Sequence, residues 1–430
     1  MSGDTIAAVA TAPGRAGVAV VRVSGPDAFA VAARLAGRVP EPGRFALRRL
    51  RDPLRSAEPV DEALVLAFRA PHSYTGEDVV EFHGHGGAVA PRRVLEACFA
   101  AGARLARRGE FTERALLNGR IDCDQAESLL DLVDAKTDRA ADAALAGLAG
   151  CRRRACRELY EAALDLSTRL EHALDVDEGA LPDGFAADTA RRIGELEERI
   201  GAEIRRAKER RILRDGALVV LAGPPNAGKS SLMNALLGES RVIVGEAPGT
   251  TRDAVEAWLD LEGWPVRLVD TAGLREAADA VEAEGVRRAE AIMARADVVV
   301  RLVPPGATPP EGATPGDVLV SSKCDLGRGR WTNVSAKTGE GLDDLRRAVV
   351  ARLVAKASAA PGAEAAPAVD EGDVSAFEAA GRLLADAAPE DPVLAANAVR
   401  AAAALLGERA GATYSADLLE NLFSRFCVGK

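Results

Sequence analysis

The residues from Gly223 to Ser230 have the spacing G-x-x-x-x-G-K-[ST]. An apolar run, Leu218 to Ala222, precedes them, and a run with helical character follows. In that setting glycines let the backbone wrap a polyphosphate, so that N–H groups and a helix N-terminus face the anion. Lys229 would then pair with the β- and γ-phosphates, and the Ser230 hydroxyl would bind Mg²⁺. A glycine turn without a ligand does not require the lysine, so the motif predicts a nucleoside triphosphate site.

Two further motifs supply groups for the metal and the γ-phosphate. Asp270-Thr271-Ala272-Gly273 ends the next apolar run, Val266 to Val269, and places a carboxylate beside Mg²⁺ and a glycine N–H near the γ-phosphate. Thr250-Thr251-Arg252-Asp253 lies between the two motifs, where a mobile loop can offer a hydroxyl to the metal.

The choice of base is indicated by a third pair of motifs. Ser321-Ser322-Lys323-Cys324-Asp325 follows the apolar run at Val318 to Val320. A carboxylate there accepts hydrogen bonds from N1 and N2 of guanine, which adenine cannot supply, and Ser335-Ala336-Lys337 has the composition of the loop behind the base. The spacing therefore predicts a guanine nucleotide. The predicted contacts are Asn226, Ala227, Gly228, Lys229, Ser230, Ser231, Gly245, Glu246, Ala247, Pro248, Gly249, Thr250, Thr251, Asp270, Thr271, Ala272, Gly273, Ser322, Lys323, Asp325, Ser335, Ala336 and Lys337.

The elements that must position these residues fall into segments of different periodicity. Strand-like runs bounded by Gly and Pro predict a small α/β unit up to about residue 118. A helical period from Asp124 to about Arg211 predicts long amphipathic helices packed as a bundle. Strand and helix alternate again from Ala217, as in a mostly parallel sheet covered on both faces. Ser358 to Asp373 has the composition of a linker, and the remainder is helical again.

Composition excludes several classes of protein. The chain has 430 residues, 48% of them apolar, and a formal charge of −10. An acidic balance argues against a surface built as a whole to clamp nucleic acid, although local clusters such as Arg152 to Arg154 could face either RNA or solvent. Asp4 stands where a signal peptide would be basic, and no run of apolar residues is long enough to cross a bilayer. We therefore expect a cytoplasmic protein without membrane association.

The nucleotide motifs resemble those of the translation-factor-related GTPases. Leu274 follows the Asp270 motif, where Ras-like proteins have the Gln that orients the attacking water. Asn226, together with the segment Gly249-Thr250-Thr251-Arg252, resembles the potassium-activated GTPases. In that group a monovalent cation takes the position of an arginine finger.

Further motifs outside the nucleotide site are Ala12-Pro13-Gly14-Arg15, Tyr74-Thr75-Gly76-Glu77-Asp78, Gly84-His85-Gly86-Gly87, Arg108-Gly109-Glu110-Phe111-Thr112-Glu113-Arg114-Ala115, Val281-Glu282 and Phe426-Cys427-Val428-Gly429-Lys430. With these motifs the chain resembles, over its full length, the MnmE (TrmE) family, GTPases that modify the wobble uridine of certain tRNAs.

The resemblance implies an α/β plus all-α architecture. It comprises a folate-binding and dimerisation domain at 1–118, a helical bundle built from 119–210 and 374–430, and a Ras-like P-loop GTPase domain inserted at 211–357. It also implies a homodimer that forms a heterotetramer with the flavoprotein MnmG. This assembly would install a carboxymethylaminomethyl or aminomethyl group at C5 of uridine 34 of tRNA, with 5-formyl- or 5,10-methylene-tetrahydrofolate as the one-carbon donor.

Site residues are implied in the same way. Glu282 would position and help to deprotonate the attacking water. Ser230 and Thr251 would bind Mg²⁺, and K⁺ would be held by Asn226, Gly245, Ala247 and Thr250. The implied folate contacts are Arg22, Glu81, Arg120 and Lys430.

The sequence departs from the family pattern at several positions. Ser322 replaces the Asn of N-K-x-D, which removes a hydrogen bond between the base loop and the phosphate loop and leads us to expect weaker nucleotide binding. Pro304 to Pro310 stands where a helix is usual, and Arg120 stands in place of Lys. The alternative function is a ribosome-assembly or signalling GTPase switch without one-carbon chemistry. The N-terminal motifs and Gly429-Lys430 favour the modification enzyme.

Overall fold

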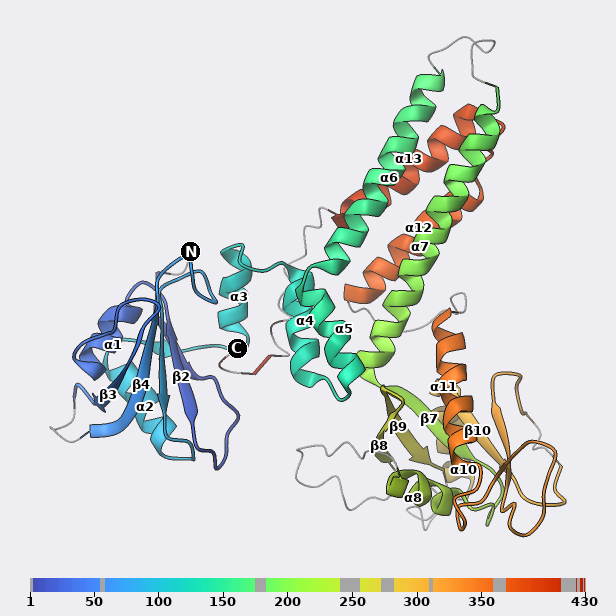
Figure 1. Cartoon of the computed structure of the whole chain (residues 1–430), viewed down its shortest axis with the longest axis horizontal. Coiled ribbons are helices and arrows are strands. Elements are labelled where there is room, and N and C mark those ends of the chain that lie inside the picture. The colour runs from blue at the N-terminus through green and yellow to red at the C-terminus, as the bar shows by residue number, and fades with distance from the viewer. Residues whose placement is uncertain are drawn as a thin grey trace. The chain divides into compact units, whose positions relative to one another are not determined.

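The computed structural model describes residues 3–54, 59–174, 183–239, 256–271, 282–308, 312–358 and 369–410, together with 423, 426, 427 and 429. It comprises two compact units, one formed by Met1–Leu130 with Thr413–Lys430 and the other by Asp131–Ala412 (Figure 1). No helix in these ranges combines the length and the apolar character needed to cross a bilayer.

A six-stranded sheet forms the first unit, with the order β3-β4-β5-β2-β1-β6. All neighbours are antiparallel except β1 and β6. The strands are β1 (Ile6–Val9), β2 (Ala19–Ser24), β3 (Phe45–Arg51), β4 (Pro59–Phe68), β5 (Val79–Gly84) and β6 (Arg104–Leu105), and the helices are α1 (Ala28–Ala36), α2 (Ala90–Ala100), α3 (Glu110–Leu117) and α4 (Cys123–Asp134).

The two faces of this sheet differ because side chains alternate along each strand. Val21, Val65 and Phe82 are buried in a core with residues of α1 and α2. The opposite face carries Arg22 beside Glu81 in the β2–β5 register. The sheet thus has one apolar face under helices and one face with polar groups.

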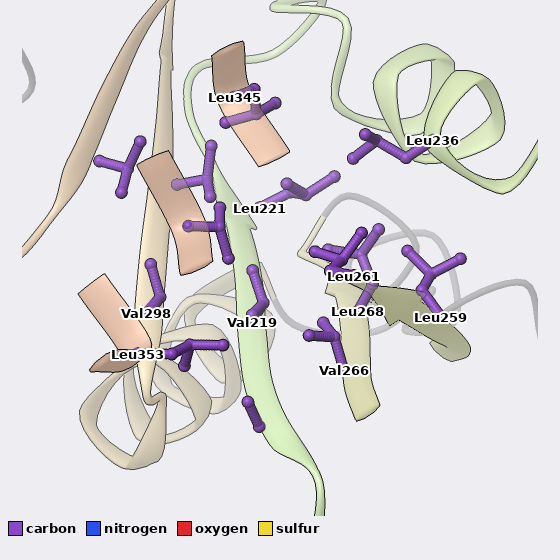
Figure 2. Close-up of a cluster of buried hydrophobic side chains, with 14 of the residues drawn as sticks. Val219, Leu221, Leu236, Leu259, Leu261, Val266, Leu268, Val298, Leu345 and Leu353 are labelled. Carbon is purple, nitrogen blue, oxygen red and sulfur yellow. The ribbon is translucent and has the colours of Figure 1, made fainter. Parts of the chain in front are cut away.

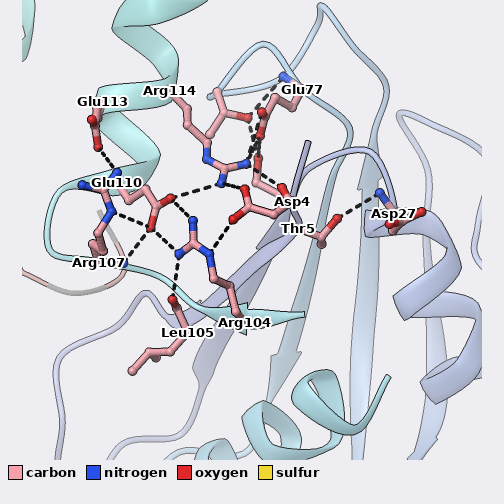
Figure 3. A network of polar contacts seen from close by, with 12 residues as sticks. Asp4, Thr5, Asp27, Glu77, Arg104, Leu105, Arg107, Glu110, Glu113 and Arg114 are labelled. Carbon is pink, nitrogen blue, oxygen red and sulfur yellow. Dashed lines mark hydrogen bonds and ion pairs between the residues drawn. The ribbon is translucent and has the colours of Figure 1, made fainter. Parts of the chain in front are cut away.

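A buried carboxylate, Glu110, ties α3 to the sheet (Figure 3). Its side chain is 2% exposed and accepts hydrogen bonds from Arg104 at 2.5 and 2.8 Å, from Arg114 at 3.1 Å and from the Arg107 backbone N–H at 2.8 Å. Burial alone would raise the pKa of Glu110, but these donors outweigh it and lower the pKa to about 2. Arg104 and Arg114 also hold Asp4, at 2.6 and 2.8 Å, and this lowers the pKa of Asp4 to about 2.

Residues near the end of the sequence belong to the same unit. Phe423 and Phe426 pack on Leu130 in a small core, and the Phe426 carbonyl accepts a hydrogen bond from Arg108 Nε at 2.9 Å. Gly429 has φ +108°, and a Cβ there would lie 2.2 Å from the Val9 carbonyl oxygen. Only glycine fits this close approach.

A second six-stranded sheet, with the order β12-β11-β10-β7-β9-β8, belongs to the second unit. All neighbours are parallel except β8, which is antiparallel to β9. Figure 2 shows the leucine and valine side chains that pack on this sheet. The strands are β7 (Ala217–Ala222), β8 (Glu256–Leu261), β9 (Trp264–Asp270), β10 (Val298–Val303), β11 (Val318–Ser322) and β12 (Thr332–Val334), and the helices nearest in sequence are α8 (Lys229–Glu239), α10 (Glu282–Arg295) and α11 (Leu342–Ser358).

Helices that precede this sheet in the sequence and helices that follow it share one hydrophobic core. Leu166, Ile200, Phe377 and Leu406 are among its buried members. The helices of the unit outside the sheet region are α5 (Asp138–Leu148), α6 (Cys151–Leu174), α7 (Phe185–Asp215), α12 (Val369–Ala385) and α13 (Pro392–Ala410) (Figure 1). The predicted linker is too long, because α11 reaches Ser358 and α12 already begins at Val369; alanine and acidic residues continue a helix as readily as they form a linker.

The turn before α5 holds the β8–β9 hairpin. Thr137 caps α5 and donates its hydroxyl to the Gly263 carbonyl at 2.8 Å. Lys136 Nζ lies 4.3 Å from the ring centre of Trp258, and the Arg139 guanidinium lies 4.2 Å from that of Trp264. Hydrogen bonding and cation–π contacts therefore fasten this edge of the sheet to the helical segment.

We expect Glu110→Gln to destabilise the first unit by about 3 kcal/mol, because Arg104 and Arg114 lose the buried carboxylate that they share. The pKa of Glu110 is lowered from 4.5 to about 2 on folding. Its contribution is therefore complete above about pH 4.5 and disappears as the pH falls towards 2. Urea unfolding at about pH 7 and about pH 3, followed by amide hydrogen exchange in β1, measures both effects. Glu113→Gln, which removes one of the two carboxylates paired with the exposed Arg107, is the control and should cost less than about 1 kcal/mol. Equal losses in the two variants would contradict the role of Glu110.

Candidate nucleotide-binding site

The phosphate loop connects the carboxyl end of β7 to the first turn of α8. Gly223 has φ +152°, and a Cβ there would lie 2.8 Å from the Leu302 carbonyl oxygen, so the loop begins with a residue that must be glycine. Asn226 takes a left-handed conformation with φ +59°. The Lys229 ammonium is 6% exposed and donates to the carbonyls of Gly223 and Pro224, at 3.0 Å each. The backbone of the loop therefore curls around the Lys229 ammonium.

Ser230 and Asp270, which the sequence assigns to the metal site, are in direct contact. Ser230 Oγ donates a hydrogen bond to Asp270 Oδ2 at 2.5 Å. Asp270 ends β9 and is 2% exposed, and the Thr271 hydroxyl donates to the Leu221 carbonyl at 2.9 Å, which fixes β9 against β7. A hydroxyl and a carboxylate are hard oxygen donors of the type that Mg²⁺ prefers, so this pair fits a magnesium site.

A pocket of about 300 Å³ lies beside the phosphate loop. Asp325 is held in it by the Ser335 hydroxyl, which donates to Oδ1 at 2.7 Å and lowers the pKa of Asp325 below its ordinary value. Lys323 has φ +57°. Its Cε lies 3.7 Å from the point that a Cβ on Gly228 would occupy, so the base loop packs on the phosphate loop. The lining residues are Ala227, Gly228, Ser231, Leu232, Ser322, Lys323, Asp325, Leu326, Val334, Ala336 and Lys337.

Leu232, Leu326 and Val334 are pocket residues that the sequence analysis did not single out. Leu326 directly follows Asp325 and is 74% exposed. Its position next to Asp325, the carboxylate predicted to bind the base, was the available signal. Leu232 and Val334 are 2% exposed each, so the pocket has two buried apolar lining residues and one exposed apolar residue at its rim.

Several predicted contacts lie outside the described residues: Gly245, Glu246, Ala247, Pro248, Gly249, Thr250, Thr251, Ala272, Gly273 and Lys430. Glu282 is the first residue of α10, and only its backbone is described. Between β10 and β11 the described residues, 304–308 and 312–317, form turns and irregular chain without a helix, as expected for this part of the segment.

A separate polar cluster lies on the sheet of the first unit. Arg22 Nε is 2.8 Å from Glu81 Oε1, and His83 Nε2 is 2.9 Å from Glu81 Oε2. The Arg22 guanidinium lies 5.2 Å from the ring centre of Tyr74 and 5.6 Å from that of Phe111. Burial would raise the pKa of Glu81, but its bonds to His83 and Arg22 outweigh burial and lower it.

Arg120 reaches the loop that carries Tyr74. Its Nε donates to the Ser73 carbonyl at 3.1 Å, and its side chain lies against Gly76. The structure therefore brings Arg22 and Glu81 into direct contact and connects Arg120 to them through the 73–76 loop. Tyr74 and Phe111 were not assigned roles from the sequence, although both lie within the quoted motifs.

The phosphate loop, the Ser230–Asp270 pair and the Asp325 pocket, at the carboxyl edge of a mostly parallel sheet, define a P-loop guanine-nucleotide-binding protein. Residues 5–120 match the family model described as GTP-binding protein TrmE N-terminus, and residues 124–427 match the MnmE helical domain. The chain therefore belongs to the MnmE family of tRNA modification GTPases.

Individual relatives agree with this assignment over the whole chain. The tRNA modification GTPase MnmE of Alkalilimnicola ehrlichii is 43% identical, with 100% of both chains covered. Those of Methylobacterium radiotolerans and Thermus thermophilus are 44% and 42% identical, each with 99% of both chains covered. Among solved structures, the G domain of the T. maritima FeoB iron transporter is 25% identical over 32% of this chain and 98% of that chain, with a TM-score of 0.24.

We expect Asp325→Asn to weaken GDP binding by about 10- to 100-fold, because it removes charge-assisted hydrogen bonds to the base. The affinity for xanthosine diphosphate should fall less than that for GDP, or rise, because the C2 carbonyl of xanthine accepts a hydrogen bond that the Asn amide can donate. Competition with a fluorescent GDP measures both affinities. Asp344→Asn, which removes a carboxylate that pairs with Arg347 on the surface of α11, should leave them unchanged. Unaltered discrimination between the two bases in Asp325→Asn would show that another residue reads the base.

Proposed function

We propose that this protein hydrolyses GTP and uses the reaction to drive modification of tRNA in the cytoplasm. With a flavoprotein partner of the MnmG type, it would install a carboxymethylaminomethyl or aminomethyl group at C5 of uridine 34, using a one-carbon unit from 5-formyl- or 5,10-methylene-tetrahydrofolate. One observation carries the proposal: a nucleotide pocket built on Asp325 and a separate Arg22–Glu81 cluster occur in one chain. Relatives named tRNA modification GTPases align with that chain from end to end.

The roles in hydrolysis follow from charge and position. Lys229 neutralises the β- and γ-phosphates, and the backbone N–H groups at the start of α8 face the same anion. Ser230 and Thr251 would hold Mg²⁺, which supplies positive charge to the transferring phosphoryl group when bound. Glu282, at the start of α10, would orient the attacking water and accept its proton.

We further propose that potassium activates hydrolysis. The Asn226 amide oxygen is a hard donor on an exposed, left-handed residue of the phosphate loop, which fits an alkali cation at the edge of the phosphates. Backbone carbonyls of Gly245, Ala247 and Thr250 would complete the site. A cation there stabilises the charge that develops in the transition state.

The polar cluster of the first unit supports the folate proposal. Arg22 is 19% exposed and flanked by two aromatic rings, a setting that suits a flat heterocycle and an anionic tail. Glu81 can accept hydrogen bonds from the donors of a pterin ring. Arg120 and Lys430 would add positive charge for the glutamate carboxylates.

Homodimerisation and the segment order complete the proposal. Phe45, Leu47 and Leu64 are 71%, 57% and 40% exposed, and Leu47 pairs with Leu64 across β3 and β4. An exposed apolar patch of this kind supports contact with a second copy. We also propose that segments 1–118, 119–210, 211–357 and 374–430 form four structural parts, the last of which contributes Phe423 and Phe426 to the first compact unit. The shared core of α6, α7, α12 and α13 supports an inserted GTPase domain.

A ribosome-assembly or signalling switch is the second candidate, since the nucleotide site alone fits that function equally well. The Arg22–Glu81 cluster favours the modification enzyme, because a binding switch does not need a site of folate chemistry.

GTP turnover should be about 10-fold faster in K⁺ than in Na⁺, because a cation of the wrong size no longer supports the transition state. Glu282→Ala should slow turnover in K⁺ by about 100-fold or more while GDP affinity is kept. Phosphate release under multiple turnover measures the rate. Glu290→Ala, on an exposed position of the same helix, is the matched control. Equal rates in the two salts would remove potassium from the proposal.

Cells that lack this protein should contain wobble uridine without the aminoalkyl group, which mass spectrometry of tRNA nucleosides detects. Complementation with Arg22→Ala should fail, because the variant loses the contact to the folate tail, and equilibrium dialysis of the purified full chain against a tetrahydrofolate should show reduced binding. Arg92→Ala, at an exposed arginine of α2 in the same unit, should complement fully. Normal uridine modification in the deletion strain would favour the switch function instead.

A further inference from the structure

The β8–β9 hairpin leads from the nucleotide site to a turn at its far end. β8 begins shortly after Thr251 in the sequence, and β9 ends at Asp270, which contacts Ser230. At about 3.3 Å per residue, the six residues of β8 carry the chain roughly 20 Å from this site before it turns at Glu262–Gly263. A displacement at the metal-binding end would therefore be carried along two paired strands to the turn.

The far end of the hairpin touches two other segments. Lys136 Nζ lies 4.3 Å from the ring centre of Trp258, and the Thr137 hydroxyl donates to the Gly263 carbonyl at 2.8 Å. The indole of Trp258 also lies against Gly216, which connects α7 to β7. A Cβ on Gly216 would lie 2.3 Å from that ring, so only glycine fits there. The turn before α5 and the end of α7 thus meet at the hairpin.

The contacts of Lys136 and Thr137 are not what holds the hairpin in the fold. β9 pairs with β7 over five residues, and Trp264 at the start of β9 is 1% exposed in the core of the sheet. One ammonium over a half-buried indole and one neutral hydrogen bond add little to such a core. They are strong enough, however, to determine where the turn before α5 sits.

That turn stands between helices that lead in two directions. α4 ends at Asp134, and its residues up to Leu130 belong to the first compact unit. α5 begins at Asp138 and is followed by α6, which contributes to the core shared with α7, α12 and α13. A displacement of the turn therefore acts on the chain both before and after it.

We propose that Lys136 and Thr137 are positioning residues that couple the nucleotide site to these helices. Replacement of GDP by GTP shifts the hairpin, and the two contacts make the turn follow it. The bound nucleotide in this way biases the α5 segment between two arrangements. The proposal rests on the proposed function and gives it a mechanical link. Neither residue lines the nucleotide pocket.

Paired substitutions in the full-length protein separate each contact from the local fold. Lys136→Gln removes the cation from the indole, whereas Lys136→Arg keeps one. Thr137→Asp keeps the oxygen that caps α5 but cannot donate to Gly263, whereas Thr137→Ser keeps both functions. Asp142→Asn removes an exposed charge from α5 and is the control.

Amide hydrogen exchange, compared between GDP and a non-hydrolysable GTP analogue, measures the link directly. In wild type, exchange should differ between the two nucleotides in both β8 and the first turns of α5. Lys136→Gln and Thr137→Asp should reduce the difference in α5 by about 3-fold and keep the difference in β8, because one weak contact shifts an equilibrium by about that factor. Lys136→Arg, Thr137→Ser and the control should behave as wild type.

The same variants should separate hydrolysis from modification. GTP turnover and GDP affinity of Lys136→Gln and Thr137→Asp should stay within about 2-fold of wild type, because neither change touches the site of hydrolysis. Wobble-uridine modification in a complemented deletion strain should fall by about 3-fold or more, and the conservative variants should restore it.

Three results would overturn the coupling. Exchange in α5 of the wild type could be insensitive to the nucleotide, or equally sensitive in Lys136→Gln and Thr137→Asp. Turnover and modification could also fall in the same proportion in these variants, as a structural defect would cause. A wild-type protein that hydrolyses no GTP would refute the proposed function itself, whereas normal turnover with unchanged modification in both variants would refute only the role of the turn.

Discussion

The parallel hydrogen-bonded register of β7 with β9 and β10 is the constraint on which the nucleotide site depends. It aligns the carboxyl ends of these strands, so that Gly223 and Asp270 emerge at one edge of the sheet. β11 and β12 extend the same register and bring Asp325 and Ser335 to that edge. Residues separated by a hundred positions in sequence meet because the backbone fixes where each strand ends.

In the first unit charge, rather than backbone register, brings distant segments together. Glu110 is surrounded by the guanidinium groups of Arg104 and Arg114, and Asp4 shares both partners. The buried Phe111 follows Glu110 and lies under Arg22, so the position of α3 also determines the shape of the polar cluster. The Arg108 to Ala115 motif therefore has a structural explanation that is independent of any ligand.

The elements predicted from the sequence were those with strong local signals. The apolar runs at Leu218–Ala222 and Val298–Val303 form strands, because short apolar segments bounded by turn residues have few alternatives. The antiparallel strand β8 was missed, since its polar alternation resembles loop sequence and its hairpin depends on Glu262 and Gly263 in left-handed conformations.

Individual contacts were less predictable than the sites that contain them. The nucleotide motifs placed Asp325 and Ser322 in the pocket, but nothing local distinguishes Ser335, which holds Asp325, from Ser322, whose hydroxyl has no hydrogen-bond partner among the described residues. The same applies to Arg22, because its aromatic neighbours come from the 73–76 loop and from α3. Side-chain contacts between residues far apart in the sequence depend on the fold, so a local residue pattern does not predict them.

The contacts at the β8–β9 hairpin also determine what the protein's own fluorescence can report. Two of its three tryptophans, Trp258 and Trp264, lie under the cations of Lys136 and Arg139. Their emission therefore monitors the attachment of the sheet edge to the α5 turn. Trp331 lies next to the base loop through its hydrogen bond to Ser321. An unlabelled chain thus contains separate optical probes for its helical junction and for its nucleotide pocket.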